Sequence, residues 1–288
     1  MTKISIRTYS YAFLLPAGII YFTFYLLPTF LSFFFSMTRW TLTDWDWIGF
    51  ENYVTFFSET SLSIGFRNTI VYAVVTSALK VVLGLLLGAF LTSSILFKSY
   101  LRSVVFFPTL LSTIAVGIAF SVMMHPSTGL INNALGAIGI NGPDWLGNTK
   151  IALLSVALVD VWKGVGIATV IYIAGITAIP REYYEALKID GGNSRAAFRH
   201  ITVPLSRPAM NSVIILAFIG GLRSFDLIWA MTKGGPGFTT DLIASIIYKQ
   251  YQAGFYGLAT AGNVILFICV SVLAFPLYKF LNKSEVNL

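Results

Sequence analysis

Four ionisable side chains lie inside long apolar stretches of this sequence. Asp160 and Lys163 are three residues apart in one stretch, and Arg223 and Asp226 are three apart in another. On a helix, a spacing of three places both members of a pair on one face. Charged groups are costly in lipid and usually face a bundle interior or a water-filled cavity. These side chains therefore either neutralise one another, within or between the two stretches, or line a path for a polar solute.

Aromatic residues alternate with these charges, namely Trp162, Phe225 and Trp229. Small-molecule sites combine aromatic walls with a few polar groups that fix orientation, so the seven side chains are candidates for a carbohydrate pathway. Packing between helices is the other interpretation of the aromatic residues. Lys80 lies near the middle of a further apolar stretch, too deep to reach the surface easily. It needs either a buried partner or water.

Several other chemistries lack the residues they require. His125 and His200 are the only histidines and Cys269 is the only cysteine, so neither a zinc cluster nor an internal disulfide can be built. The chain contains no HxxxH or HExxH pattern and no GxxxxGK[ST] phosphate loop. A membrane-embedded enzyme and a P-loop ATPase are both disfavoured.

The composition is that of a membrane protein. Of 288 residues, 56% are hydrophobic and 11% are charged, and the mean hydropathy is +0.78. Soluble domains have roughly 25% charged residues. A bilayer core needs about 20 apolar helical residues per span. The apolar runs predict an all-α transmembrane domain over residues 11–283, with six helices at about 11–36, 69–97, 103–124, 151–179, 208–231 and 258–278.

The positive charges predict an orientation. If residues 1–10 are cytoplasmic, the inner side collects eleven Lys and Arg residues and the outer side collects five. This bias is typical of membrane proteins whose inner loops are positive, and it places both termini in the cytoplasm. The net charge of +7 is then explained by topology, and no nucleic-acid partner is expected.

The inner loop between the fourth and fifth spans, residues 179–208, reads IPREYYEALKIDGGNSRAAFRHITVPLSRP. Pro180 suits the start of a helix, and Asp190-Gly191-Gly192 suits its end. A second, basic helix is predicted from about Ser194 to Thr202, with Ser194 as its cap and Pro204 at its end. Such a loop is either an ordinary solvated surface or a docking element. Its compactness favours docking, because a short helix held by prolines and glycines can transmit force.

The same loop resembles a known motif. Glu185-Ala186-Leu187, Asp190-Gly191-Gly192, Phe198 and Pro204 are similar to the EAA motif, whose pattern is EAA, three residues, G and a run ending in I-x-L-P. That motif belongs to the permease subunits of binding-protein-dependent ATP-binding-cassette importers. WIGFENY at 47–53, the run at 224–240 and the segment 162–180 resemble the carbohydrate branch, particularly its maltose- and glycerol-phosphate-type first permease subunit. Leu187 and Gly192 stand where this family usually has Ala.

The resemblance implies the transmembrane domain of a type I importer, in which residues 181–191 form a coupling helix in a cleft of an ATPase subunit. Glu185 would face a basic group there. The implied partners are a second homologous permease subunit in a heterodimer, two cytoplasmic ATPase subunits and an extracytoplasmic solute-binding protein. ATP and Mg would bind the ATPases, so that this chain is neither an enzyme nor a cofactor carrier. The implied location is the prokaryotic cytoplasmic membrane.

The turn Gly234-Gly235-Pro236-Gly237 lies at the outer end of the fifth span. It is either a plain loop or, as the resemblance implies, a surface that faces the solute-binding protein together with the 40–60 loop.

Two readings of function remain after these exclusions. The leading one is a permease subunit that forms half of the pathway of an ATP-driven carbohydrate importer and is coupled through the 181–191 helix. The alternative is an ion-coupled secondary sugar carrier that works alone and uses the intramembrane charges as a relay. Carriers of that type commonly show internal repeats, and none is visible here.

Overall fold

The computed structural model describes residues 11–283, and most of these residues are helical. The described residues divide into two compact units, 11–58 with 247–265 and 59–246 with 266–283. The predicted all-α fold class is confirmed, with a short β-hairpin as an addition. The predicted cytoplasmic segment, residues 1–10, lies outside the described residues.

The first unit opens with a continuous helical run in which α1 and α2 each carry a proline in the first turn. A proline cannot donate the backbone hydrogen bond of a continuous helix, and in both places it follows a turn that is wound differently from an α-helix. The run bears almost no buried side chain within this chain, as expected of a helix that faces lipid or another subunit. The elements are η1 (Tyr11–Leu14), α1 (Leu15–Tyr21), η2 (Phe22–Leu26) and α2 (Leu27–Phe35).

A hairpin and a short helix follow α2. Strand β1 (Thr38–Trp40) pairs antiparallel with β2 (Trp45–Trp47), and α3 spans Glu51–Ser58. The buried side chain of Asn52 donates from Nδ2 to the carbonyl oxygens of Ser36 at 2.9 Å and Thr38 at 2.8 Å. These bonds hold α3 against the end of the first helical run, so the segment introduced above as the 40–60 loop has an ordered structure.

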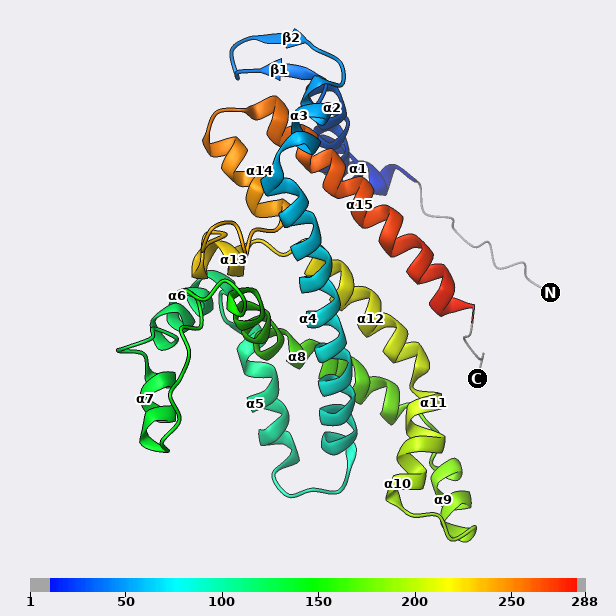
Figure 1. The fold of residues 1–288 in the computed structure, drawn as a ribbon. Coiled ribbons are helices and arrows are strands. Elements are labelled where there is room, and N and C mark those ends of the chain that lie inside the picture. Colours follow the sequence, from blue (N-terminus) through cyan, green and yellow to red (C-terminus); the bar gives the residue numbers. More distant parts are fainter. Residues whose placement is uncertain (1–10, 284–288) are drawn as a thin grey trace, which may run out of the picture. The chain divides into compact units, whose positions relative to one another are not determined.

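The second unit is built around two long helices, α4 and α8, which pack along each other. Helix α12 packs on both of them, α5 packs on α8, and α13 packs on α6 (Figure 1). Helices α14 and α15 contain residues of both units. The elements are α4 (Thr60–Thr92), α5 (Lys98–Leu110), α6 (Thr113–Met123), α7 (Leu130–Ala137), α8 (Ala152–Thr177), α9 (Arg181–Ile189), α10 (Ser194–Ala197), η3 (Phe198–Thr202), α11 (Val203–Leu205), α12 (Arg207–Leu222), α13 (Asp226–Met231), α14 (Ile243–Gln252) and α15 (Tyr256–Asn282).

Two glycines one turn apart allow α4 and α8 to approach closely. A Cβ atom at Gly84 would lie 2.7 Å from Ala168 Cβ, and one at Gly88 would lie 2.7 Å from Tyr172 Cβ. Because lipid supplies no hydrophobic force between helices, small residues that let backbones meet are the usual basis of packing in membranes. The pair therefore determines how α4 and α8 lie against each other.

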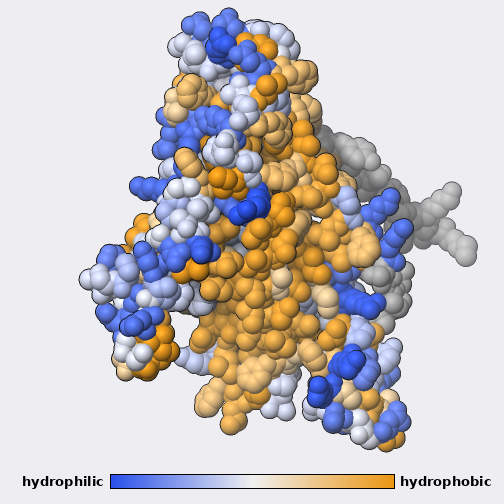
Figure 2. Space-filling view, in the orientation of Figure 1, coloured by the Kyte–Doolittle hydropathy of each residue, from blue (hydrophilic) through white to orange (hydrophobic). Residues whose placement is uncertain are grey.

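Four helices among the described residues are long and apolar enough to cross a membrane, and six spans result if each of two bent helix pairs counts as one. Figure 2 shows the matching surface, with apolar residues spread over the middle of the long helices and hydrophilic residues gathered around α9 and α10. The four single helices are Leu15–Phe35, Thr60–Thr92, Ala152–Thr177 and Tyr256–Asn282.

The predicted span over 103–124 is broken into two helices in the structure. Helix α5 ends at Leu110, and α6 starts at Thr113 after a bend of 96°. Pro108 lies inside the last turn of α5 and cannot donate a backbone hydrogen bond there. The helix therefore ends two residues later, and a new one begins in a different direction.

The predicted span over 208–231 is also broken into two helices. Helix α12 ends at Leu222, and α13 begins at Asp226. The pair Gly220-Gly221 lowers helix propensity directly before the break. Arg223 and Asp226 are therefore separated by a non-helical segment, and the prediction that they share one helical face is wrong.

Candidate functional site

Helix α9 forms within the segment that resembles a coupling loop. Pro180 precedes its first residue, Glu182 lies in its first turn and Lys188 in its last, which matches the sign of the helix dipole at both ends. Gly191 adopts a φ of 78°, a conformation that glycine takes without strain. Gly192 N–H then donates to Leu187 O at 2.8 Å. The predicted start and stop of this helix agree with the structure.

The second helix of the loop differs from its prediction. Its cap is Asn193, whose Oδ1 accepts from Ala196 N at 2.9 Å, and not Ser194. Asn at the cap position satisfies a backbone donor in the same way as Ser. The helical path continues through η3 and ends at Leu205, one residue after Pro204.

One side of α9 contacts the rest of the unit and the other is exposed. Tyr184 and Leu187 are half-buried, and the Tyr184 hydroxyl lies 3.1 Å from Thr202 Oγ1 in η3. Glu185, Ala186, Asp190 and Gly191 are exposed, while Gly192, Phe198 and Pro204 are half-buried. The exposed side thus presents one carboxylate, a small residue and a glycine to whatever docks there.

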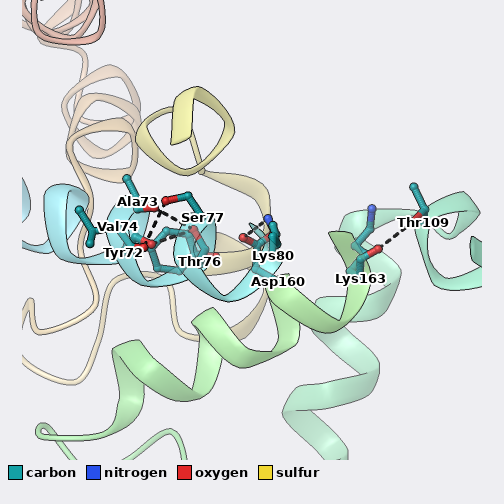
Figure 3. Close-up of polar contacts among 9 residues, drawn as sticks. All are labelled: Tyr72, Ala73, Val74, Thr76, Ser77, Lys80, Thr109, Asp160 and Lys163. Carbon is teal, nitrogen blue, oxygen red and sulfur yellow. Dashed lines mark hydrogen bonds and ion pairs between the residues drawn. The ribbon is translucent and has the colours of Figure 1, made fainter. Parts of the chain in front are cut away.

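A half-buried ion pair joins the two long helices of the second unit. Lys80 Nζ on α4 lies 2.7 Å from Asp160 Oδ2 on α8, and the two side chains are 12% and 21% exposed. Figure 3 shows the two side chains meeting between α4 and α8. Gly164 makes room for the lysine, because a Cβ atom there would lie 2.7 Å from Lys80 Cε. Lys80 therefore has a protein partner in this structure.

Two hydroxyl side chains lie beside this ion pair. Tyr72 is fully buried on α4, and its hydroxyl lies near Asp160 and near Ser224. This hydroxyl makes no hydrogen bond within the described chain. Ser224 belongs to the break between α12 and α13. The cluster of Tyr72, Lys80, Asp160 and Ser224, here called the polar cluster, thus links three elements of the unit.

The structure separates the other predicted pathway residues from this cluster. Lys163 lies apart from the pair in Figure 3, and its carbonyl oxygen accepts from Thr109 Oγ1 on α5 at 3.0 Å. Trp162 contacts Phe120 of α6 with ring centroids 5.1 Å apart. Arg223 and Asp226 are both exposed at the helix break. Phe225 and Trp229 stack on each other at 5.7 Å.

The idea that Asp160 is neutralised by Lys163 is therefore wrong for this structure, since its partner is Lys80. Tyr72 and Ser224 were not among the predicted site residues. Tyr72 and Lys80 are eight residues apart, a spacing that places them on one face of a helix. That spacing could have indicated Tyr72, whereas Ser224 is brought to the cluster by a helix break that the sequence pattern does not reveal.

The Gly234-Gly235-Pro236-Gly237 turn lies in a loop that is tied down by hydrogen bonds. Thr232 Oγ1 and Thr240 Oγ1 are 2.7 Å apart. Asn68 Nδ2 of α4 donates to Thr239 O at 2.9 Å and to Asp241 O at 3.1 Å. The loop from 232 to 241 is therefore an ordered surface and not a loose connection.

Comparison with known proteins places these features in a family. Residues 80–285 match the family model "Binding-protein-dependent transport system inner membrane component". The chain is 31% identical to the probable ABC transporter permease protein YurN of Bacillus subtilis, covering 96% of both chains. It is 31% identical to the trehalose/maltose transport system permease protein MalF of Thermococcus litoralis, covering 90% of this chain and 89% of that one.

Solved structures share the fold. A chain of a bacterial ABC transporter involved in the import of the acidic polysaccharide alginate is 22% identical, with a TM-score of 0.82 and 96% of both chains covered. A second structure, of a bacterial alginate ABC transporter in complex with an alginate pentasaccharide-bound periplasmic protein, gives a TM-score of 0.78 at 24% identity, covering 95% of this chain and 92% of that one. The fold and the family match agree, and this chain is a member of the family of inner membrane components of binding-protein-dependent transport systems.

Proposed function

We propose that this chain forms half of the membrane pathway of an ATP-driven carbohydrate importer and transmits ATPase movement to its spans through α9. The single observation that carries this function is the family match over residues 80–285. It favours an importer subunit over a carrier that works alone. The carbohydrate class is supported by the printed functions of relatives, among them the MalF protein and a multiple sugar-binding permease of Streptococcus mutans at 30% identity.

The role of α9 is supported by its connections. Pro180 joins it directly to the end of α8, and the path through α10, η3 and α11 joins it to α12. The contact between Tyr184 and Thr202 ties the helix to that return path. A displacement of α9 by a docked ATPase would therefore act on α8 and α12 together. The exposed Glu185 is the residue proposed to pair with a basic group of the ATPase.

The polar cluster is the proposed centre of the movement. Lys80 and Asp160 join α4 to α8, and Ser224 lies at the break that separates α12 from α13. A break of this kind lets two half-helices change their relative direction at low cost. Trp162, Lys163, Arg223, Phe225, Asp226 and Trp229 remain proposed wall residues of the pathway, together with Asp160.

The remaining parts of the assembly follow from the same proposal. A second permease subunit completes the pathway, two ATPases bind ATP and Mg on the cytoplasmic side, and both termini of this chain are cytoplasmic. The ordered loop from 232 to 241 and the 40–60 segment face the solute-binding protein outside.

Affinity purification from the native membrane in mild detergent, with mass spectrometry of the co-purifying proteins, tests the assembly. Recovery of a second multi-span permease and a P-loop ATPase is expected. A chain that purifies alone or only as a homodimer would overturn the proposal.

A charge reversal at Glu185 tests the coupling. Glu185→Lys should lower ATP-driven sugar uptake at least about tenfold, because one buried contact with a charged group is worth roughly 1.5–3 kcal/mol. Glu185→Gln, which keeps the shape, should be intermediate. Membrane abundance must equal that of the wild type in both variants. Uptake at the wild-type rate in Glu185→Lys would show that α9 does not dock through this residue.

A further inference from the structure

A pocket of about 440 Å³ opens where the ends of α4 and α8 meet the starts of α5 and α9. All of these elements belong to the second unit. The pocket is lined by two cations and several hydroxyl groups, and its lining residues include no carboxylate; the polar ones are Thr92, Ser93, Lys98, Thr177, Arg181, Tyr184 and Thr202. The hydroxyl protons of Thr92, Ser93 and Thr177 are donated to backbone carbonyls, so the two cations are what make this cavity favour an anion.

The two cations keep hydrogen-bonding capacity for a ligand. Lys98 Nζ donates to Thr92 O at 3.0 Å, which uses one of the three N–H donors of an ammonium group. Arg181 is the exposed first residue of α9. Neither side chain forms an ion pair with any residue in the part of the chain that the structure describes. Within residues 11–283, no carboxylate therefore compensates their charge.

Helix ends modify this charge without cancelling it. The start of α9 adds unpaired N–H groups and partial positive charge, whereas the end of α4 carries partial negative charge. Lys98 and Arg102 both bind carbonyl oxygens at the end of α4, the latter through Nη2 to Leu91 O at 3.0 Å. The negative end of α4 is thus satisfied from within the chain, and the pocket remains positive.

The turn next to the pocket has the composition of a membrane interface. Leu96, Phe97 and Tyr100 are 84%, 79% and 69% exposed, and they flank Lys98 in the sequence. Apolar and aromatic side chains beside a cation are typical of segments that lie among lipid headgroups. The pocket therefore opens at the depth where lipid phosphates lie, and a phosphate is the anion most abundant there.

We propose that this pocket binds the phosphate of an anionic phospholipid, with Lys98 and Arg181 as its cationic contacts and the hydroxyl pair of Tyr184 and Thr202, which keeps one free proton, as an additional donor. Basic pockets between transmembrane helices on the cytoplasmic side are typical sites for such headgroups. The proposal rests on the proposed function in one respect. It takes α9 to lie on the cytoplasmic side, which places the pocket in the cytoplasmic leaflet. Since Arg181 begins α9, a bound lipid would hold the proposed coupling helix against the ends of α4 and α8.

Titration of the purified chain, with whatever subunits accompany it, by phosphatidylglycerol and by phosphatidylcholine tests the site, with native mass spectrometry counting the bound lipids. The wild type should prefer phosphatidylglycerol. Lys98→Gln with Arg181→Gln should weaken phosphatidylglycerol binding about 30-fold, since each removed cation near a surface weakens binding about fivefold. Glutamine at 98 can still donate to Thr92 O, so α4 keeps its cap.

Lys279→Gln is the matched control, because Lys279 is an exposed cation at the end of α15 and does not line the pocket. It should change binding by less than about twofold. Should the double variant not reach the membrane, Arg181→Gln alone serves, with an expected loss of about fivefold. Equal phosphatidylglycerol binding by the pocket variants and the wild type would overturn the proposal.

Two further results would overturn it in favour of another ligand. Displacement of phosphatidylglycerol by millimolar inorganic phosphate would indicate a site for a soluble phosphate. Loss of phosphatidylglycerol whenever an ATPase co-purifies would indicate that an acidic side chain of the ATPase fills the pocket. Lipid binding is measured without ATP, so Glu185→Lys should still bind phosphatidylglycerol. A variant that loses sugar uptake but keeps lipid binding therefore has a fault in coupling and not in the lipid site.

Discussion

The side chain of Leu187 occupies the space into which a Cβ atom at position 192 would project. Such an atom would lie 2.7 Å from Leu187 Cδ1 and 2.9 Å from the Leu187 carbonyl oxygen. Position 192 can therefore carry only glycine while position 187 carries leucine in this conformation. The two departures from the EAA pattern are complementary, because the larger residue at one position is accommodated by the smaller one at the other.

Gly192→Ala should therefore destabilise the end of α9 by about 1–3 kcal/mol, as overpacking of a closed contact does. The double variant Leu187→Ala with Gly192→Ala should recover part of this loss, since it removes the contacts with the side chain but not the contact with the carbonyl oxygen of residue 187. Hydrogen exchange of the 185–193 backbone in the purified protein measures the effect. Equal exchange in Gly192→Ala and in the wild type would contradict the complementarity.

The ion pair between Lys80 and Asp160 should behave as a coupled unit. Lys80→Met or Asp160→Asn alone should each cost up to about 3–5 kcal/mol, which is the cost of leaving a fully buried charge without its partner; both side chains here are partly exposed. The combined variant should be more stable than either single variant. Thermal unfolding of the purified protein reports all three. Lys163→Met is the control on α8, the helix of Asp160, and should lower stability much less. A loss of stability as large as that of Lys80→Met would argue against a special role of the pair.

Gly84→Ala and Gly88→Ala should weaken the packing of α4 on α8 by about 1–3 kcal/mol each, because each new methyl group meets α8 at 2.7 Å. Gly220→Ala provides the matched control, since no other atom lies within 4 Å of a Cβ placed there. It should leave stability unchanged or raise it by up to about 1 kcal/mol, as alanine favours the helix. Thermal unfolding distinguishes the two cases. Equal changes in thermal stability for all three variants would mean that Gly84 and Gly88 do not determine the packing of α4 on α8.

Asn68→Ala should loosen the loop from 232 to 241, because it removes both hydrogen bonds to Thr239 and Asp241. Leaving buried carbonyl groups without partners costs about 1–3 kcal/mol. Faster hydrogen exchange across 234–241 is expected, together with weaker capture of the solute-binding protein if the loop faces it. Asn263→Ala, at an exposed position on α15, is the control. An unchanged rate of hydrogen exchange in Asn68→Ala would show that contacts other than those of Asn68 keep the loop ordered.

Much of the architecture follows from the residue types alone. Long runs without charge predict helices that cross lipid, since a helix satisfies all its backbone hydrogen-bonding groups within one segment. The prolines and glycines around 180–192 likewise predict α9, because their backbone preferences are local. The EAA resemblance indicates the family, and residues 80–285 match that family.

Tertiary structure decided which intramembrane groups meet. Lys80 finds Asp160 across two helices, and Gly164 opens the space for it, while Lys163, only three residues from Asp160, does not pair with it. Periodicity assigns residues to a face of one helix but does not say which helix lies opposite. The breaks after Leu110 and Leu222 are partly local, since Pro108 and the Gly220-Gly221 pair weaken the helix there. The hydrophobic runs nevertheless continue across both breaks, and packing with neighbouring helices sets the direction of the helix that follows.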